Sequence, residues 1–272
     1  MVDERKNDWV GQTASLDRPN PARIYDYLLG GHHNFAADRA AAEKMVEVIP
    51  HAAEGAAAQR AFLRRAIDFF TAQGIDQFLD IGSGLPTVGN VHELARATIP
   101  NARVVYVDVD PVVIAHSSQL LKDVLGATII EGDLRRSREI LEHKELRSHL
   151  DLDRPLALTM TAVIHYIVDD ETAYDSITTM IDAIAPGSYV AISHALIEER
   201  SREEMEKAAD DYKAAASVKA RTRDGIARFM DGLELVEPGL VRGPLWRPEG
   251  PDDVLLDNSE VFSALVAVGR KP

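Results

Sequence analysis

A short apolar segment that runs into a glycine turn sets the main constraint on how this chain folds. Residues 78–81 form a strand candidate that contains Asp80, and Gly82, Ser83 and Gly84 follow directly. Because glycine has no Cβ, such a turn can bend tightly and approach a ligand closely. Ligands of open α/β sheets bind at the carboxyl ends of strands. The segment therefore predicts a binding turn after the first strand of an α/β sheet, although an ordinary strand-to-helix turn has the same form.

The residues around the turn indicate a cationic ligand that lacks phosphate. A dinucleotide fingerprint has a third glycine where this sequence has Thr87. Pro86 has no backbone N–H to offer a pyrophosphate, and the Asp80 carboxylate would repel that group. An ammonium group would instead be attracted to Asp80. S-adenosylmethionine (SAM) is a ligand of this kind.

Strands alternate with helices after the turn, a pattern typical of a mostly parallel sheet with helices on both faces. The expected strands span residues 77–81, 103–108, 127–131, 156–162 and 188–193. Between them we expect helices at 90–98, from 111, at 136–146 and at 171–184. Further helices are expected at 202–218 and 224–230. Strand candidates at 233–241, interrupted at Pro238-Gly239, and at 261–269 are expected to pair as an antiparallel hairpin at the sheet edge.

The N-terminal part of the chain reads as a helical addition to this sheet. Residues 1–18 are polar, and we expect them to be flexible. A helix is predicted from Pro21, with Asn20 as its N-cap, and Gly30-Gly31 would end it. Alanine-rich helices follow at 36–48 and 54–72. We expect residues 19–73 to form a cap and residues 74–272 the ligand-binding domain, together one compact unit.

The ends of the expected strands carry side chains suited to an adenosine ligand. Asp108 ends the second strand, where an acid can accept hydrogen bonds from both ribose hydroxyls. Asp133 follows the third strand and can accept one from the adenine amino group. The apolar neighbours Val109 and Leu134 can enclose the ring. Thr161 lies at the end of the fourth strand, close to where the reactive group of the ligand would lie.

Each of these residues also has a structural interpretation. Asp108 can cap the helix that begins at Pro111, although Asp110 competes for that role. Asp133 can be a simple turn residue. His165, which follows the fourth expected strand, can be a histidine at the edge of the core. Their alignment at four strand ends favours the ligand site.

Several segments together resemble a known family. They are RIYDYLLGG (residues 23–31), NFAADR (34–39), FLDIGSGLPT (78–87), and the pairs Val107-Asp108 and Gly132-Asp133. The chain resembles the class I SAM-dependent methyltransferases and, more narrowly, the S-adenosyl methyltransferase family first catalogued as a domain of unknown function. The resemblance implies a Rossmann-like, seven-stranded, mostly parallel sheet of order 3-2-1-4-5-7-6, with SAM at the strand ends. Pro86 departs from the wider superfamily, which has glycine there.

Catalysis of methyl transfer depends mainly on aligning an acceptor with the sulfonium, and on a base where the acceptor must lose a proton. His165 is the best-placed candidate base, and His33 is a second choice. We expect Tyr27, Gly31 and Asn34 to cover the methionine end of SAM as part of a lid. The alternative for that segment is a glycine-terminated surface helix.

Composition narrows the possible partners. A net charge of −14 disfavours nucleic-acid binding, and residues 161–164 lack the Asn-Pro-Pro-Tyr type of motif. Cysteine is absent, and the nine histidines show no metal-ligand spacing, so we expect no metal. The first residues do not resemble a signal peptide, and the apolar run 155–168 is too short to span a bilayer. We therefore expect a cytoplasmic protein.

The favoured function is a SAM-dependent methyltransferase that acts on a small-molecule acceptor and releases S-adenosylhomocysteine (SAH). A module that binds SAM or SAH without catalysis is the first alternative. An NAD-dependent oxidoreductase is the second, and the arguments from Asp80, Pro86 and Thr87 oppose it. The acceptor and the oligomeric state stay open.

Overall fold

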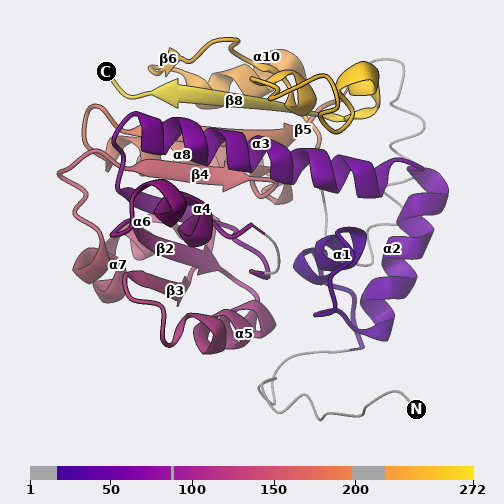
Figure 1. Ribbon diagram of the computed structural model, residues 1–272, viewed down its shortest axis with the longest axis horizontal. Coiled ribbons are helices and arrows are strands. Elements are labelled where there is room, and N and C mark those ends of the chain that lie inside the picture. The colour runs from indigo at the N-terminus through magenta and orange to yellow at the C-terminus, as the bar shows by residue number, and fades with distance from the viewer. Residues whose placement is uncertain (1–16, 87–88, 198–217) are drawn as a thin grey trace.

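The computed structural model describes residues 17–86, 89–197 and 218–272. A single sheet lies at its centre and carries helices on both faces (Figure 1). Its strand order is β3-β2-β1-β4-β5-β8-β6, and β7 pairs with β8. The strands are β1 (Gln77–Ile81), β2 (Arg103–Asp108), β3 (Ala127–Glu131), β4 (Ala157–Thr161), β5 (Tyr189–Ala195), β6 (Glu234–Leu235), β7 (Val241–Arg242) and β8 (Ala264–Arg270).

This order confirms the predicted arrangement 3-2-1-4-5-7-6. Strands β1 to β5 pair in parallel, and β8 is antiparallel to β5, β6 and β7. The sixth predicted strand is divided into β6 and β7 on either side of Pro238-Gly239. The seventh begins at Ala264, because residues 256–261 form a 3-10 helix, and it lies between β5 and the β6/β7 pair. The predicted hairpin thus exists, with β8 on its inner side.

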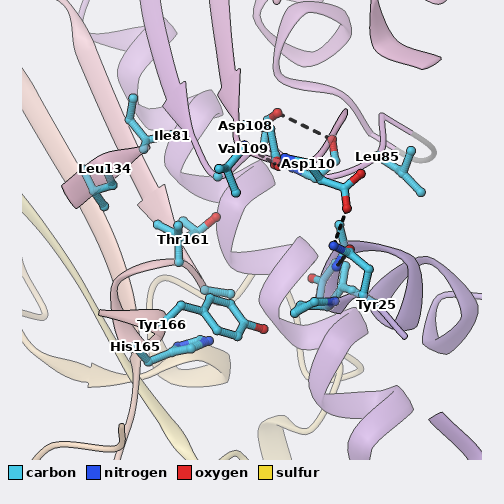
Figure 2. A pocket seen from close by; sticks show the side chains of 18 of the residues that line it. Tyr25, Ile81, Leu85, Asp108, Val109, Asp110, Leu134, Thr161, His165 and Tyr166 are labelled. Carbon is cyan, nitrogen blue, oxygen red and sulfur yellow. Dashed lines mark hydrogen bonds between the residues drawn. The ribbon is translucent and has the colours of Figure 1, made fainter. Parts of the chain in front are cut away.

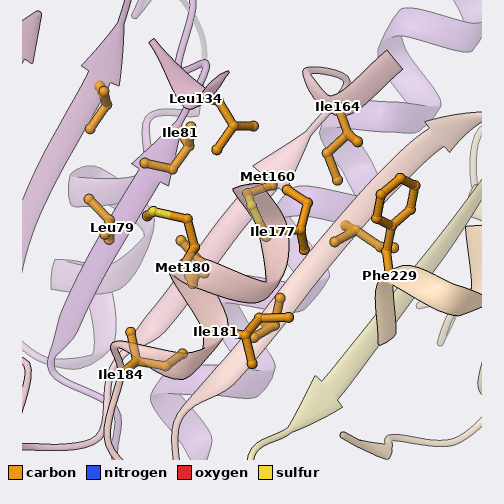
Figure 3. Close-up of a cluster of buried hydrophobic side chains, with 14 of the residues drawn as sticks. Leu79, Ile81, Leu134, Met160, Ile164, Ile177, Met180, Ile181, Ile184 and Phe229 are labelled. Atoms are coloured by element: carbon orange, nitrogen blue, oxygen red, sulfur yellow. The ribbon is translucent and has the colours of Figure 1, made fainter. Parts of the chain in front are cut away.

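Alternate side chains of β1 enter two separate cores, because neighbouring residues of a strand face opposite sides of the sheet. Leu79 and Ile81 belong to the core shown in Figure 3. That core is covered by α6 (Ser137–Glu142), α7 (Lys144–His149) and α8 (Asp170–Asp182), with α10 (Arg223–Ala227) at one end. Phe78 faces the other core, covered by α3 (Ala52–Ala72), α4 (Val91–Thr98) and α5 (Pro111–Leu121).

Helix α3, which we expected in the cap, packs against one face of the sheet. Its side chains Phe62, Ile67 and Phe70 are fully buried in the core that contains Phe78. Helices α1 (Pro21–Leu28) and α2 (Ala36–Val48) stand away from the sheet, on the side toward which the β4 arrow points (Figure 1). These two helices therefore lie at the carboxyl ends of the parallel strands.

Buried charges fasten α1 and α2 to each other and to the sheet. Arg23 of α1 donates from Nε to Asp38 of α2 at 2.8 Å, and both side chains are almost fully buried. Asp38 also accepts hydrogen bonds from the backbone N–H groups of Asn20 and Phe35. Asn20 and Arg23 both contact the Asp110 carboxylate, which follows β2. The cap is thus tied to the end of β2.

Capping explains where these helices begin. Asn20 accepts hydrogen bonds from the backbone of Ala22 and Arg23, as the sequence predicts for the start of α1. Asp110 does the same for α5 through its other carboxylate oxygen. The competition between Asp108 and Asp110 is therefore resolved in favour of Asp110 as the cap.

The region from 218 onward includes α10 and a 3-10 turn where a helix at 224–230 is predicted. The predicted helix at 202–218 lies almost entirely outside the described residues. Within the described ranges, no helix combines the length and the apolarity that crossing a membrane requires.

Asp38→Asn should destabilise the protein strongly, because it removes the carboxylate 2.8 Å from the buried Arg23 guanidinium and leaves the more distant Asp110, at 3.5 Å, as its anionic neighbour. We expect a loss of about 3–5 kcal/mol in the free energy of unfolding, measured with urea. Glu139→Gln is the matched control, since its 3.8 Å pair with Arg136 is exposed to solvent. That change should alter the free energy by less than about 0.5 kcal/mol. Equal effects of the two substitutions would contradict the structural role of the Arg23–Asp38 pair.

Candidate functional site

A cavity of about 730 Å³ lies where the strand ends meet the cap (Figure 2). Such a volume suits a cofactor together with a small substrate. The structure brings most of the predicted site residues to its wall: Asp80, Gly82, Ser83, Gly84, Asp108, Val109, Asp133, Leu134, Thr161 and His165. From the cap, Tyr25, Leu28 and Met45 are among the residues that line it.

The glycine turn uses its own backbone donors internally. The N–H groups of Gly82 and Ser83 donate to the Val107 carbonyl at 2.8 and 3.1 Å, and Gly84 N–H donates to Asp108 at 2.8 Å. Gly82 and Gly84 have φ values of 69° and 62°, a region that favours glycine. No amide of these three residues is left for a phosphate, so recognition of a ligand falls to side chains.

Asp80 is a buried carboxylate that accepts a hydrogen bond from Thr159 Oγ1 at 2.5 Å. Burial raises the pKa of Asp80 to about 6, while the Thr159 bond and the nearby Arg60 oppose the rise. The carboxylate is therefore ionised at neutral pH in an environment that penalises the charge. A ligand ammonium group in the cavity would relieve this penalty.

Arg60 of α3 is a residue that sequence reasoning missed. It lines the cavity beside Asp80, and its Nε is buried without a hydrogen-bond partner. Its guanidinium lies 5.7 Å from the ring centroid of Tyr25. A buried guanidinium donor left unpaired is costly, and a ligand carboxylate would pair with it.

Gln59, the neighbour of Arg60, was also missed. It is 7% exposed, and its Nε2 has no partner. Ala56, Gln59 and Leu63 follow one face of α3 at helical spacing, so Gln59 occupies a position where the pattern calls for an apolar residue. This polar residue within an otherwise apolar helix face was the feature of the sequence that could have indicated a role for Gln59.

Asp108 is largely committed to the backbone. Its Oδ1 accepts from the N–H groups of Val109 and Asp110, and its Oδ2 accepts from Gly84. A carboxylate offers about four acceptor sites. One site is left, so Asp108 has room for one ribose hydroxyl where the sequence predicts bonds to both.

Asp133 is paired with Arg135 at 2.6 Å and also accepts from the Arg135 backbone. Burial alone would raise the pKa of Asp133, but the hydrogen bonds from Arg135 outweigh it and lower that pKa. Arg135 is more than half exposed. An adenine amino group would therefore have to share Asp133 with a solvated arginine.

His165 lies with Tyr166 across the cavity from Tyr25 (Figure 2). Burial, with additional effects from His194 and Arg221, lowers the pKa of His165 to about 3. Its Nδ1 is buried without a partner. The imidazole is thus neutral at physiological pH and a weak acceptor of protons.

The residues predicted to form the lid, Tyr27, Gly31 and Asn34, do not line the cavity. Tyr27 donates to Glu43 at 3.3 Å, and Asn34 donates to Asp26 at 2.8 Å. A Cβ on Gly31 would lie 2.0 Å from Asp26 Oδ1, so this glycine makes room for the Asp26 carboxylate. The positions of these residues support a structural role in the α1–α2 connection.

His33 belongs to the same connection. Its backbone N–H donates to Asp26, and its ring lies 4.1 Å from that of His116 on α5. It too lies outside the cavity wall. Among the described residues, no group of three or more histidine, aspartate or glutamate side chains is arranged to hold a metal ion.

Comparison with known proteins bears on the chemistry of this cavity. Residues 7–272 match the family model of the S-adenosyl methyltransferases. The chain belongs to the S-adenosyl methyltransferase family. Its cofactor is therefore SAM.

Solved structures agree with this membership. A candidate methyltransferase from Thermobifida fusca YX is 38% identical, with a TM-score of 0.86 over 94% of this chain and 96% of that chain. A DUF574 family protein from Streptomyces avermitilis MA-4680 is 36% identical, with a TM-score of 0.89 over 95% of this chain and all of the other. An O-methyltransferase family protein from Burkholderia thailandensis, 12% identical with a TM-score of 0.51 over 80% and 59%, shares the fold alone. No curated protein matched the chain.

The residues of this S-adenosyl methyltransferase fit the amino-acid part of SAM. Asp80 and Arg60 supply an anion and a cation in the same part of the cavity, opposite in sign to an ammonium and a carboxylate. Asp108, Val109 and Leu134 line the part that suits adenosine. The Arg60 Nε, which has no hydrogen-bond partner, is a suitable donor for the carboxylate of SAM.

Affinity for SAH should depend on pH through Asp80. Since its pKa is about 6 in the free protein, the carboxylate becomes protonated below that pH and loses its attraction for an ammonium. The dissociation constant should be level between about pH 7.5 and 6.5, then rise by up to about tenfold per pH unit. Calorimetric titrations measure this.

The control is Asp80→Asn, which keeps the shape of the side chain. It should bind SAH more weakly and without the rise below pH 6, and it should remain folded, since it removes a buried charge. A variant that kept the wild-type affinity and pH profile would exclude Asp80 from the site.

Proposed function

We propose that this protein transfers the methyl group of SAM to a small-molecule acceptor. The observation that carries the proposal is the presence of both Asp80 and Arg60 in the wall of one cavity, since their charges match the two ends of an α-amino acid. The cap encloses the acceptor side of the cavity with Tyr25 and Leu28, which favours a small molecule. A net charge of −14 disfavours nucleic acid as the acceptor.

Each part of the cavity has its own role in this proposal. Asp80 pairs with the ammonium of SAM, and Arg60 pairs with its carboxylate. Asp108 accepts a hydrogen bond from one ribose hydroxyl, while Val109 and Leu134 pack against the adenine. Of the residues predicted for the cofactor, Tyr27, Gly31 and Asn34 are assigned no contact with it.

Ala162 follows β4 and lines the cavity, next to where the methyl group of SAM would lie in this proposal. Its φ of 54° is a conformation that residues with a Cβ rarely adopt. Its N–H donates to Ser193 Oγ at 2.8 Å, which holds the strained turn in place. Such strain is common at functional sites.

The sulfonium of SAM supplies an activated methyl group, so the protein's main task is to align the acceptor. Held by Asp80 and Arg60, SAM would supply this methyl group to a lone pair of the acceptor and leave as SAH. His165, with its lowered pKa, orients the acceptor in this scheme and does not store a proton at neutral pH. A proton lost by the acceptor passes to water. His33 has no role here.

The NAD alternative is opposed by the glycine turn, whose N–H groups are all used internally. A module that binds SAM without catalysis would use the same contacts with the cofactor. Product analysis distinguishes it from an enzyme. Incubation with isotopically methyl-labelled SAM and a library of small acceptors should give a labelled product that Asp80→Asn forms far more slowly. Absence of labelled product across the library would favour the binding module.

Arg60→Met should weaken SAH binding by roughly tenfold to a hundredfold, because it removes a charge-assisted hydrogen bond. It should leave 5′-methylthioadenosine almost unaffected, since that ligand lacks the amino-acid part. Calorimetry with both ligands measures the difference.

Arg64→Met is the matched control, because Arg64 pairs with Glu249 on the surface at 2.6 Å. It should change neither affinity. An equal loss for SAH and methylthioadenosine in Arg60→Met would show that Arg60 acts on the fold of the site and not on the carboxylate.

A further inference from the structure

A second chamber, of about 180 Å³, adjoins the SAM cavity. The two share the wall residues Tyr25, Leu28, Gln59, Ala162 and His165. From there the chamber continues between α3 and the facing ends of β5 and β8. It therefore begins beside the strained end of β4, where the methyl group would be presented.

Gly55 of α3 keeps this chamber open. It is the fourth residue of the helix and has no positive φ, and a Cβ added to it would meet no atom within 4 Å. Glycine is less favourable than alanine inside a helix, and the neighbouring positions are alanine-rich. Neither backbone conformation nor packing requires a glycine here, and as a lining residue Gly55 leaves the chamber wall without a side chain at this point.

Gln59 provides a hydrogen-bond donor on the same helix face, one turn further along. Its side chain is 7% exposed and lines the chamber, and its Nε2 has no partner among the described residues. A buried amide N–H₂ without a partner is unfavourable. An oxygen atom of a ligand in the chamber would satisfy it.

The polar groups around the chamber are all uncharged. Its described lining contains no aspartate, glutamate, lysine or arginine. His194 donates from Nδ1 to the Ala195 carbonyl at 2.8 Å and accepts from Arg221 at Nε2, which fixes it as a neutral tautomer. His165 is neutral as well. The Arg221 guanidinium behind His194 already pairs with Asp170 and donates to the Ile167 carbonyl. A charged ligand would therefore be partly desolvated here without an opposite charge in direct contact, which is unfavourable.

We propose that this chamber is the acceptor subsite, and that it takes an uncharged molecule whose hydroxyl or carbonyl oxygen accepts a hydrogen bond from Gln59. The proposal rests on the methyltransferase function, because an acceptor subsite requires SAM to be bound in the adjoining cavity. It adds the class of acceptor: neutral oxygen-bearing compounds are selected over carboxylates and ammonium compounds.

The test uses three probes of similar size on the full chain saturated with SAH: phenol, benzoate and benzylammonium. Ligand-observed NMR and calorimetry measure their binding. Phenol should bind saturably, and each charged probe at least tenfold more weakly. Gln59→Leu should weaken phenol binding by roughly fivefold, because it removes the donor while keeping the volume.

Gly55→Leu should weaken phenol binding at least tenfold by filling the chamber, while SAH affinity stays unchanged. Gly250→Leu is the matched control, because an added Cβ at Gly250 also meets no atom within 4 Å and this loop residue lies outside the chamber. It should leave phenol binding intact. Thermal unfolding of both variants confirms that each is folded.

The possible outcomes distinguish failure of the proposed function from failure of the acceptor subsite. Failure of the wild-type protein to bind SAH would overturn the proposed function. With SAH bound, the acceptor subsite would be overturned by an absence of saturable phenol binding, by charged probes binding as well as phenol, or by unchanged phenol binding in Gly55→Leu. The comparison among probes uses the wild-type protein, so it decides the question even if Gly55→Leu does not fold.

Discussion

The buried pair between Arg23 and Asp38 is the interaction on which the site depends. It holds α1 against α2, and through Asn20 and Asp110 it ties both helices to the end of β2. The cavity has walls from both the sheet and the cap, so its shape depends on how this connection positions the cap. A buried ion pair adds little net stability compared with an apolar pair, but removing one partner is costly. Such a pair therefore fixes the position of the cap more than it strengthens the fold.

The electrostatics of the site follow from a backbone that is already saturated. The N–H groups of Gly82, Ser83 and Gly84 donate to acceptors on β2. Asp108 accepts hydrogen bonds from Gly84 and from the backbone that follows β2, which uses most of its acceptor sites. A phosphate-binding loop needs those donors free. With the donors used, binding of a cofactor relies on Asp80 from β1 and Arg60 from α3. The absence of a third glycine at Thr87 is consistent with a turn that binds no phosphate.

The local pattern of the sequence predicted much of this fold, because strands β1 to β5 are apolar runs between clear turn and capping signals. The order of the strands was implied by the family resemblance, whereas the convergence of Asp80, Asp108, Asp133 and Thr161 follows from parallel pairing. Arg60 and Gln59 could not be placed in this way, because their role depends on how α3 lies across strands that come later in the chain. Tyr27 and Asn34 were expected at the cofactor because a tyrosine-rich helix followed by a polar loop was judged poor core material, and the sequence does not show which residues of that segment face the cavity. In α1 the buried face contains Arg23, which pairs with Asp38, and Asp26, which accepts from His33 and Asn34, while Tyr25 lines the cavity.

The central claim is that a Rossmann-like turn with saturated backbone donors has become a site for a zwitterionic adenosine ligand without phosphate. Calorimetric titration of the full chain with SAM, SAH and NAD tests it most directly. We expect saturable binding of SAM and SAH at one site per chain, and no detectable binding of NAD at the same concentrations. Binding of NAD in preference to SAM, or no binding of SAM and SAH, would contradict the claim.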